Sequence, residues 1–390
     1  MFKIKPAMAT ILFTILHFLV DGICALVIFS SLYDDDKTNA LIIFLVYNII
    51  AFCTQPFVGL LIDKYKNKER LFLIISIISL MLGVIFKFQY IISAILLGIG
   101  NSFFHVSGGK YVISKTNNNI VSLGVFVSTG ALGLAIGTNI HHLSIWITFI
   151  SLALIITSIL LLSKDIEIEE NNISNELNLN QNWILILTLM IIAVVLIRSF
   201  VGKIIPLDFD KPIWVLLLIG ASAMLGKALG GIIAKYIGIN KTIVITMVLS
   251  AILLICFNSN LYLSLFGILL FNCSMPLTLY LINDLLKKRE GFAFGLLAAF
   301  LVPGYLFGMF NYPIIATKIM IGILSLLSLL LVIFVNIKMN KEKKADWYRY
   351  INLLFTNMPN WGNIIIDFIR KKKDSFIILV SYKRNNKHTT

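Results

Sequence analysis

The stretch GLLIDKYKNKER, from Gly59 to Arg70, places four basic side chains within seven positions and separates two long apolar runs. Of the 390 residues, 58% are hydrophobic and only 13% are charged, and the mean hydropathy is +0.92. Soluble domains, which mix core and surface residues, do not reach such values. The composition therefore indicates a polytopic membrane protein, in which this stretch is a loop between two membrane-spanning helices.

The pattern of apolar runs predicts an all-α integral membrane protein with about 12 transmembrane helices. One crossing of a hydrocarbon core about 30 Å thick takes about 20 apolar residues. The first run, residues 6–32, is too long for the core of a signal peptide. The breaks between the predicted helices fall at residues 34–39, 63–70, 87–90, 115–119, 139–142, 163–182, 203–212, 235–241, 257–260, 287–291 and 311–313, and the last helix is expected to end near Lys338.

Basic residues are distributed unequally between the loops on the two sides of these helices. With the N-terminus placed inside, the outer loops hold only Lys37, Lys87, Lys203 and Lys211. The basic loops fall inside, as the positive-inside rule requires, so we expect both termini in the cytoplasm. The Ile-, Asn- and Lys-rich composition is typical of AT-rich bacterial genomes and favours a bacterial plasma membrane. The net charge of +14 then reflects topology, and no nucleic-acid partner is expected.

The chain repeats itself after 171 residues. This shift places the following residues on one another: Gly59, Ile62, Lys64 and Tyr65 on Gly230, Ile233, Lys235 and Tyr236, Asn101 on Asn272, and Gly124, Gly133 and Gly137 on Gly295, Gly304 and Gly308. A parallel repeat of two six-helix bundles is a transporter architecture in which the substrate binds between the halves. The repeat therefore predicts a transporter.

The repeat divides the chain into four predicted segments. Residues 1–163 are the N-terminal six-helix bundle, 164–182 a cytoplasmic acidic linker, and 183–338 the C-terminal six-helix bundle. Residues 339–390 alternate aromatic, aliphatic and basic residues, which is typical of an amphipathic segment on an anionic inner leaflet.

The opening stretch resembles a known signature. Gly59-x-x-x-Asp63-Lys64, followed by further lysines, is similar to the loop 2-3 signature of the major facilitator superfamily. The second copy keeps Gly230 and Lys235 but has Ala234 where the aspartate would stand. The resemblance covers about residues 6 to 338 and implies the two-bundle fold of that superfamily.

Three further stretches resemble the fosmidomycin-resistance branch of drug efflux proteins. They are HFLVDG at 17–22, GIGNSFFHVSGGKY at 98–111 and MPLTLYLINDLL at 275–286. Val106 follows His105 where that branch usually has proline. This resemblance implies proton-coupled export of a small, drug-like molecule.

The glycine-rich run GVFVSTGALGLAIG, residues 124–137, resembles an element of drug-proton antiporters but lacks its proline. Gly130, Gly133 and Gly137 share one helix face and permit close packing. Gly304 and Gly308 give a later helix the same character, so we expect tight packing between the two halves.

The signature residues have a physical role in the resemblance. An aspartate at the inner end of a helix can accept hydrogen bonds from the N-terminus of a neighbouring helix and pair with basic residues, which closes an inner gate. The predicted gate set is Gly59, Asp63, Lys64, Gly230 and Lys235. The alternative is a solvated charged loop that only sets topology.

Several polar residues fall inside apolar runs. An ionised side chain at the bilayer centre costs on the order of 2.5–3.5 kcal/mol, so it normally faces a polar cavity or a partner. The predicted substrate and proton pathway consists of Asp21, His17, Gln55, Asn101, His105, Arg198, Lys227 and Asn272.

Asp21, one turn from His17, is expected to carry the proton and could pair with Arg198. Arg198 and Lys227 outnumber this single buried anion, which favours an anionic substrate. Each of these polar residues has an alternative role. Asp21 and Arg198 could form a structural ion pair, Lys227 could snorkel to the interface, and His105 could be neutral and pack between helices.

The loops show no nucleotide-binding motif, metal-ligand spacing or nucleophile constellation. The sequence therefore predicts a monomeric secondary active transporter rather than an enzyme, with a small-molecule substrate, no cofactor or metal, and the proton gradient as energy source. The alternatives are an uptake permease, a membrane sensor, and a membrane enzyme with His105 and Asp21 as an acid/base pair.

Overall fold

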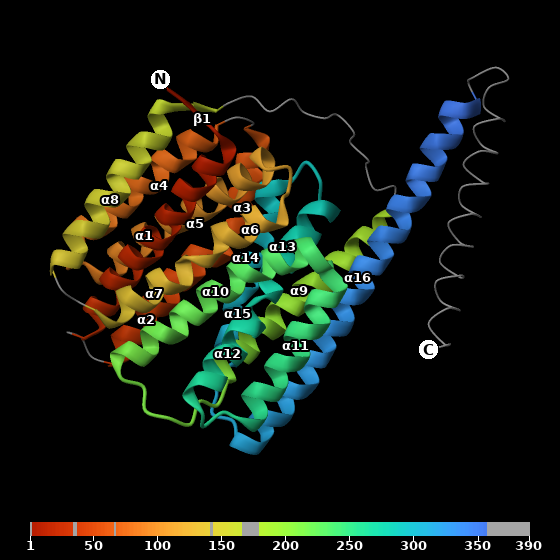
Figure 1. Cartoon of the computed structure of the whole chain (residues 1–390). Coiled ribbons are helices and arrows are strands. Elements are labelled where there is room, and N and C mark those ends of the chain that lie inside the picture. Colours follow the sequence, from red (N-terminus) through yellow and green to blue (C-terminus); the bar gives the residue numbers. More distant parts are fainter. Residues whose placement is uncertain (1, 34–36, 66–67, 141–142, 166–178, 357–390) are drawn as a thin grey trace. The chain divides into compact units, whose positions relative to one another are not determined.

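The computed structural model describes residues 2–33, 37–65, 68–140, 143–165 and 179–356 (Figure 1). Most of the acidic linker and residues 357–390 of the predicted amphipathic tail lie outside the described residues. The chain forms two units, one of residues 1–171 and 180–337 and one of residues 172–179 and 338–390. The description below concerns the first unit unless stated otherwise.

The first six predicted crossings are helical. Their helices are α1 (Pro6–Tyr33), the broken run α2 (Lys37–Asn48), η1 (Ile49–Cys53) and α3 (Gln55–Lys64), then α4 (Glu69–Ile85), α5 (Tyr90–Lys115), the broken pair α6 (Ile120–Ser128) and α7 (Gly130–Asn139), and α8 (Leu143–Leu162).

The second six crossings are also helical. Their helices are α9 (Gln181–Ile204), α10 (Ile213–Ile237), α11 (Ile239–Cys256), the broken pair α12 (Leu261–Asn272) and α13 (Ser274–Leu285), the broken pair α14 (Glu290–Ala299) and α15 (Leu301–Phe307), and α16 (Ile314–Thr356). Within the described residues, eleven crossings are long and apolar enough to span a membrane, and α4, the remaining crossing, is slightly shorter with 17 residues.

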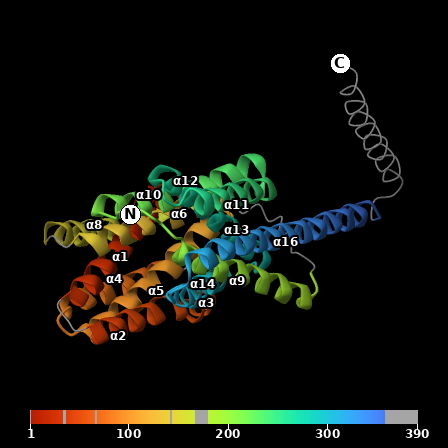
Figure 2. The ribbon, with the colours of Figure 1, turned by 90° about the horizontal axis from the view of Figure 1, so that it is seen from below.

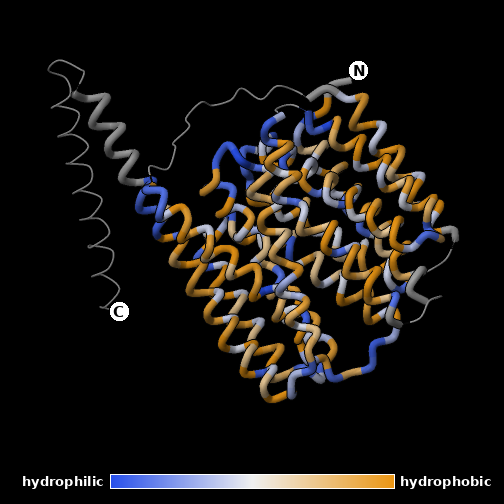
Figure 3. Tube along the Cα trace, turned by 180° about the vertical axis from the view of Figure 1, so that it is seen from behind, coloured by the Kyte–Doolittle hydropathy of each residue, from blue (hydrophilic) through white to orange (hydrophobic). Residues whose placement is uncertain are grey.

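Asparagine side chains begin several of these helices. Asn119, Asn180 and Asn260 each accept a hydrogen bond from a backbone N–H of the first turn of α6, α9 and α12. Such caps satisfy backbone donors that have no partner inside the helix. Apolar residues run along the helices and hydrophilic residues gather in the loops, which is the pattern of a chain surrounded by lipid (Figure 3).

Two of the helix breaks are related by the repeat. The fifth crossing breaks at Thr129 and the eleventh at Phe300, and the repeat shift superimposes these residues. The second crossing instead contains the π-helical turn η1 ahead of Pro56, whose ring cannot donate the regular helix hydrogen bond. Broken helices at corresponding places in two halves are typical of transporters that bind substrate near these breaks.

The two halves lie side by side, with residues 6–162 in warm colours and residues 181–337 in green and blue (Figures 1 and 2). Helix α3 packs against α14, and α6 packs against α10. Both contacts are close: a Cβ at Gly124 would meet the carbonyl oxygen of Lys227, and a Cβ at Gly295 would meet that of Gln55. These two contacts correspond under the repeat shift, so the sequence repeat is also a repeat of packing.

The glycines of α7 pack differently from the prediction. A Cβ at Gly133 would meet the carbonyl oxygen of Phe18, and a Cβ at Gly137 would meet that of Gly22, both on α1. In the second half, Gly304 and Gly308 pack against α9. The expectation that these glycines join the two halves is therefore wrong, because their shared face points to the first helix of their own half.

A small parallel sheet departs from the all-α expectation. Strand β1 (Phe2–Ile4) pairs with β2 (Ser163–Asp165), and Phe2 lies opposite Ser163. Arg70 donates a hydrogen bond to the carbonyl oxygen of Ser163. The start of the chain is thereby attached to the end of α8.

The last helix is longer than predicted. Helix α16 continues past Lys338 to Thr356, and Lys338 pairs with Glu342 one turn later at 2.9 Å. The expectation that it ends near Lys338 is wrong because residues 338–356 contain neither glycine nor proline. Loss of apolar character ends the predicted span there, but it does not end a helix.

Candidate functional site

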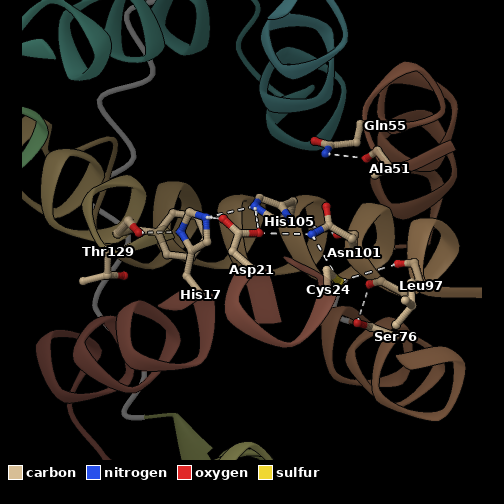
Figure 4. A network of polar contacts seen from close by, with 12 residues as sticks. His17, Asp21, Cys24, Ala51, Gln55, Ser76, Leu97, Asn101, His105 and Thr129 are labelled. Atoms are coloured by element: carbon tan, nitrogen blue, oxygen red, sulfur yellow. Dashed lines mark hydrogen bonds and ion pairs between the residues drawn. The ribbon is translucent and has the colours of Figure 1, made fainter. Parts of the chain in front are cut away.

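Three polar side chains of α1 and α5 converge on Asp21 (Figure 4). The Asp21 carboxylate lies 3.2 Å from His17 Nε2 and 3.5 Å from His105 Nε2. Asn101 Nδ2 donates to Asp21 Oδ1 at 3.0 Å. His17 and Asp21 share one face of α1, as their spacing predicts, and His105 and Asn101 share one face of α5. We call these four residues the Asp21 cluster.

Backbone carbonyls hold both imidazole rings of the Asp21 cluster. His17 Nδ1 lies 2.8 Å from the carbonyl oxygen of Phe126, and His105 Nδ1 lies 3.0 Å from that of Asn101. A carbonyl oxygen can only accept, so each Nδ1 carries the hydrogen. The two Nε2 atoms, 2.9 Å apart, therefore face one another.

The cluster is enclosed on most sides. His17, His105 and Asn101 are buried, and Asp21 is partly exposed. A Cβ at Gly130 would contact both Asp21 Oδ2 and His17 Nε2. The glycine that opens α7 therefore leaves the space that the carboxylate and the imidazole occupy.

Asp21 borders a cavity between the two halves with a volume of about 420 Å³. Its lining comes from α1, α2, η1, α7, α9 and α15 and includes five aromatic residues: Phe29, Phe44, Tyr47, Phe52 and Tyr305. Among the described lining residues, Asp21 is the single charged one. The cavity is thus an aromatic chamber with one carboxylate, and its concave apolar form suits a small molecule.

Arg198 and Lys227 are arranged differently from the prediction. Asp21 pairs with His17 and His105 of its own half. Arg198, buried on α9, has Thr278 Oγ1 as its hydrogen-bond acceptor at 3.5 Å. The expected pair of Asp21 with Arg198 is therefore not the arrangement of this conformation. Spacing places a residue on a helix face, but it does not determine which helix lies opposite.

Lys227 lies on α10, close enough to Arg198 and Asp21 to interact with both electrostatically. Within the described part of the chain, its ammonium group makes no hydrogen bond, and neither cation lines the aromatic cavity. Arg198, which is buried, and Lys227, which is partly exposed, therefore remain available to an anion.

The last two predicted pathway residues lie apart from the cluster. Gln55 is fully buried, donates to the carbonyl oxygen of Ala51 at 2.8 Å, and leaves its Oε1 without a hydrogen-bond partner among the described residues. Asn272, the repeat partner of Asn101, donates to Ile268 within its own helix at 2.9 Å. The two asparagines therefore make different contacts although the repeat relates them.

Asp63 connects the two halves at the end of α3. Its Oδ1 accepts a hydrogen bond from Gly291 N at 2.9 Å, and its Oδ2 accepts one from Phe292 N at 2.8 Å. Both donors belong to the first turn of α14. A Cβ at Gly59 would meet the backbone of Gly291, so only glycine permits this approach. We call this region the Asp63 contact.

Lys110 belongs to this contact, although the sequence analysis does not place it there. Its Nζ lies 3.4 Å from both Asp63 Oδ1 and Glu69 Oε1, and it donates to the carbonyl oxygen of Ile62 at 2.9 Å. The signal is present in the sequence, since a lysine inside an apolar helix needs a partner. Asn118 adds a further hydrogen bond between the halves, which its Nδ2 donates to the carbonyl oxygen of Tyr280 at 3.1 Å.

The other predicted gate residues lie outside this contact. Lys64 is exposed with its Nζ 5.9 Å from the Tyr65 ring centroid, and Lys235 is exposed. Gly230 packs against Cys273 within the second half. The second copy of the signature cannot form an equivalent contact, because it has Ala234 at the position of the aspartate.

No protein-family model and no curated protein sequence matches the chain. Among solved structures, the chain resembles a major facilitator superfamily transporter, FucP, in the outward conformation, with a TM-score of 0.61 and 11% identity over 84% of this chain and 99% of that chain. It also resembles a variant of the E. coli fucose:proton symporter FucP, with a TM-score of 0.61 and 12% identity over 85% of this chain and 99% of that one. The chain has the fold of major facilitator transporters, with two six-helix bundles.

Proposed function

We propose that the chain is a secondary active transporter that works by alternating access. One observation carries the proposal: a cavity between two repeat-related halves is bordered by the partly exposed Asp21 carboxylate, while the Asp63 contact joins the halves at the other end of the helices. A site that is reached from one side and closed on the other is one state of such a cycle. The proposed gate therefore consists of Asp63, Gly59 and Lys110, and the cluster is the proposed coupling site.

We place the protein in a bacterial plasma membrane with both termini in the cytoplasm. The loop charges support this orientation, because the lysine-rich loop after Asp63 then faces inside. The Asp63 contact becomes an inner gate, and the cavity is reached from outside. Residues 1–163 and 183–338 are the proposed moving halves, and residues 339–390 the proposed segment on the anionic leaflet. We further propose that the transporter works as a monomer.

The proposed coupling ion is the proton. The Asp21 cluster holds a carboxylate between two imidazoles next to the cavity, and these are the side chains that relay protons in membranes. A solved structure of the same fold is that of a fucose:proton symporter. No cofactor is needed in this scheme.

The proposed substrate is a small anionic or drug-like molecule. The aromatic side chains of the cavity supply apolar contact, and Arg198 and Lys227, which lie outside its lining, supply positive charge in the same part of the molecule. The resemblance of the HFLVDG stretch to drug efflux proteins supports export by proton antiport. The alternative is uptake by symport, which the likeness to a symporter favours.

Reconstitution into proteoliposomes with a pH-sensitive dye inside tests both directions. Phosphonates, carboxylates and amphipathic drugs are added outside in turn without an ion gradient. Substrate entry should raise the internal pH in an antiporter, because protons leave, and lower it in a symporter. Asp21→Asn should still bind the active compound but move no protons, whereas Asp208→Asn in an exposed loop should behave as wild type. A compound that is bound and transported without any pH change would contradict proton coupling.

A further inference from the structure

The Asp21 cluster is incomplete as it stands. Both Nδ1 atoms donate to backbone carbonyls, so each neutral imidazole presents a lone pair on Nε2. These two lone pairs face one another at 2.9 Å, and the Asp21 carboxylate adds a third acceptor. Asn101 satisfies Oδ1 of the carboxylate, but no donor among the described residues lies between Oδ2 and the two Nε2 atoms, and acceptors that converge in this way repel one another. The geometry therefore requires a cation among them.

A proton meets this requirement only in part. One proton between His17 Nε2 and His105 Nε2 bridges two of the acceptors and leaves the carboxylate outside the bridge. A metal ion binds all three at once. The ligand atoms of His17, Asp21 and His105 all lie within 4.8 Å of one another, and zinc binds imidazole nitrogen and carboxylate oxygen at about 2.0–2.2 Å.

The surroundings orient the three groups as ligands. A metal-bound histidine usually donates its second ring nitrogen to a carbonyl or carboxylate, and both imidazoles here do so. Asn101 Nδ2 holds Asp21 Oδ1 at 3.0 Å, while Oδ2 lies 3.2 Å from His17 Nε2. One carboxylate oxygen is thus positioned by a hydrogen bond, and the other faces the imidazole nitrogen.

We propose that His17, Asp21 and His105 form a binding site for one divalent transition-metal ion, with the two Nε2 atoms and a carboxylate oxygen as ligands. Two imidazoles and a carboxylate select ions of the zinc, cobalt and nickel class over magnesium or calcium. Asp21 borders the cavity, so a water molecule or an anionic group from the cavity completes the coordination. The site shares its residues with the proposed coupling site, but metal binding does not require transport.

Metal binding is measured on the purified full chain in lipid nanodiscs, without an affinity tag that contains histidine and after removal of metal with a chelator. Titration with Zn²⁺ in competition with an indicator dye should give one site per chain. His105→Gln and His17→Gln should each weaken binding at least about tenfold. The control replaces the other histidines, His141, His142 and His388, by alanine, and this variant should bind as wild type.

A second measurement needs no variant and so does not depend on the folding of one. X-ray absorption at the zinc edge of the wild-type complex should show imidazole and oxygen neighbours. Binding that is lost in the control variant, an all-oxygen or sulfur-containing shell, or no binding at micromolar Zn²⁺ would each overturn the metal site. If Zn²⁺ does not bind at micromolar concentration, the cluster binds only protons. Proton-coupled transport without metal binding would leave the proposed function intact, so the two proposals fail separately.

Discussion

Two helix N-termini that the repeat relates are capped in different ways. In α6, Asn119 Oδ1 accepts hydrogen bonds from Val121 N at 2.9 Å and Ser122 N at 3.3 Å, so the helix caps itself. In α14, the residue at the cap position, Arg289, makes no such side-chain bond. Its first turn is capped by Asp63 of the other half instead.

The difference makes one interface separable and the other costly to open. Moving α6 away from α10 leaves the N-terminus of α6 satisfied. Moving α3 away from α14 leaves two backbone donors without partners and removes a carboxylate from the positive end of a helix. We therefore propose that the α6–α10 interface acts as a bearing, which separates at low cost, and that the α3–α14 interface acts as a latch, which is costly to open. Substitutions on each side can test this asymmetry.

The largest expected effect comes from Lys110→Met. The substitution removes the ammonium that lies between Asp63 and Glu69 and leaves two carboxylates, both largely shielded from solvent, without the cation between them. Loss of one partner from a buried ion pair costs about 3–5 kcal/mol. The melting temperature of the purified protein should fall sharply.

Two controls accompany this variant. Lys64→Met removes an exposed lysine that follows Asp63 directly in the sequence and should change little. Lys110→Met combined with Glu69→Gln should recover part of the loss, because one of the opposing charges is gone. A single Lys110→Met variant with wild-type stability would show that Lys110 does not support the latch.

Gly59→Leu breaks the latch by sterics instead of charge. The added side chain meets the backbone of Gly291, so α3 must move away from α14 and Asp63 loses its donors. We expect the closed state to be destabilised by about 3 kcal/mol, since overpacking a tight contact costs about 1–3 kcal/mol before the lost hydrogen bonds are counted. A cysteine at Phe294, whose ring packs 6.0 Å from Phe126 across the halves, should then react faster with maleimide.

Gly202→Leu is the matched control, because the nearest atom to a Cβ there is Phe271 Cε1 at 3.9 Å. It should leave the labelling rate of the cysteine at Phe294 unchanged. Equal acceleration by both substitutions would mean that a larger side chain loosens the fold in general, and would contradict a specific role of Gly59.

The sequence points to Gly59 and Asp63 as parts of this latch, but it does not point to Lys110. The spacing of Gly59 and Asp63 in a short loop is a pattern of adjacent residues, and such patterns can be read without a structure. Lys110 is 47 positions from Asp63, and only the packing of α5 on α3 brings them together. Contacts of that kind depend on which helices are neighbours, and apolar periodicity does not encode this.

The Asp21 cluster shows the same limit. The relation of His17 to Asp21 follows from the helix repeat, and so does that of Asn101 to His105. The helix repeat does not show that these two pairs face one another across α1 and α5. For this reason the sequence alone suggests Arg198 as the partner of Asp21. Sequence reasoning also misses the aromatic cavity, because its lining comes from six separate elements.

Asp63→Ala should have an intermediate effect on the latch. It removes both bonds to the first turn of α14 but leaves the Lys110 to Glu69 pair. A hydrogen bond to a charged group contributes about 1.5–3 kcal/mol, and water replaces part of it once the helices separate. We expect a loss of about 2 kcal/mol in the closed state, or about thirtyfold in its population.

The cysteine at Phe294 reports this loss as faster labelling. Asp63→Asn retains one acceptor oxygen and should fall between alanine and the wild type. If alanine and asparagine both label at the wild-type rate, the carboxylate only sets topology, which is the alternative that the sequence leaves open.

Asn119→Ala tests the bearing and should have the smallest effect. The substitution removes the acceptor of two first-turn donors in α6, and loss of such a cap costs about 1 kcal/mol. Because that cap lies within one half, the cost is the same whether the halves are together or apart. The melting temperature should therefore fall slightly while the labelling of a cysteine at Phe294 stays at the wild-type rate. The labelling rate of this variant should be compared with that of Asp63→Ala. We expect Asp63→Ala to accelerate labelling far more than the loss of one helix cap does. If Asn119→Ala accelerates labelling as much as Asp63→Ala does, both N-termini act as latches, and the asymmetry between the two interfaces has no mechanical consequence.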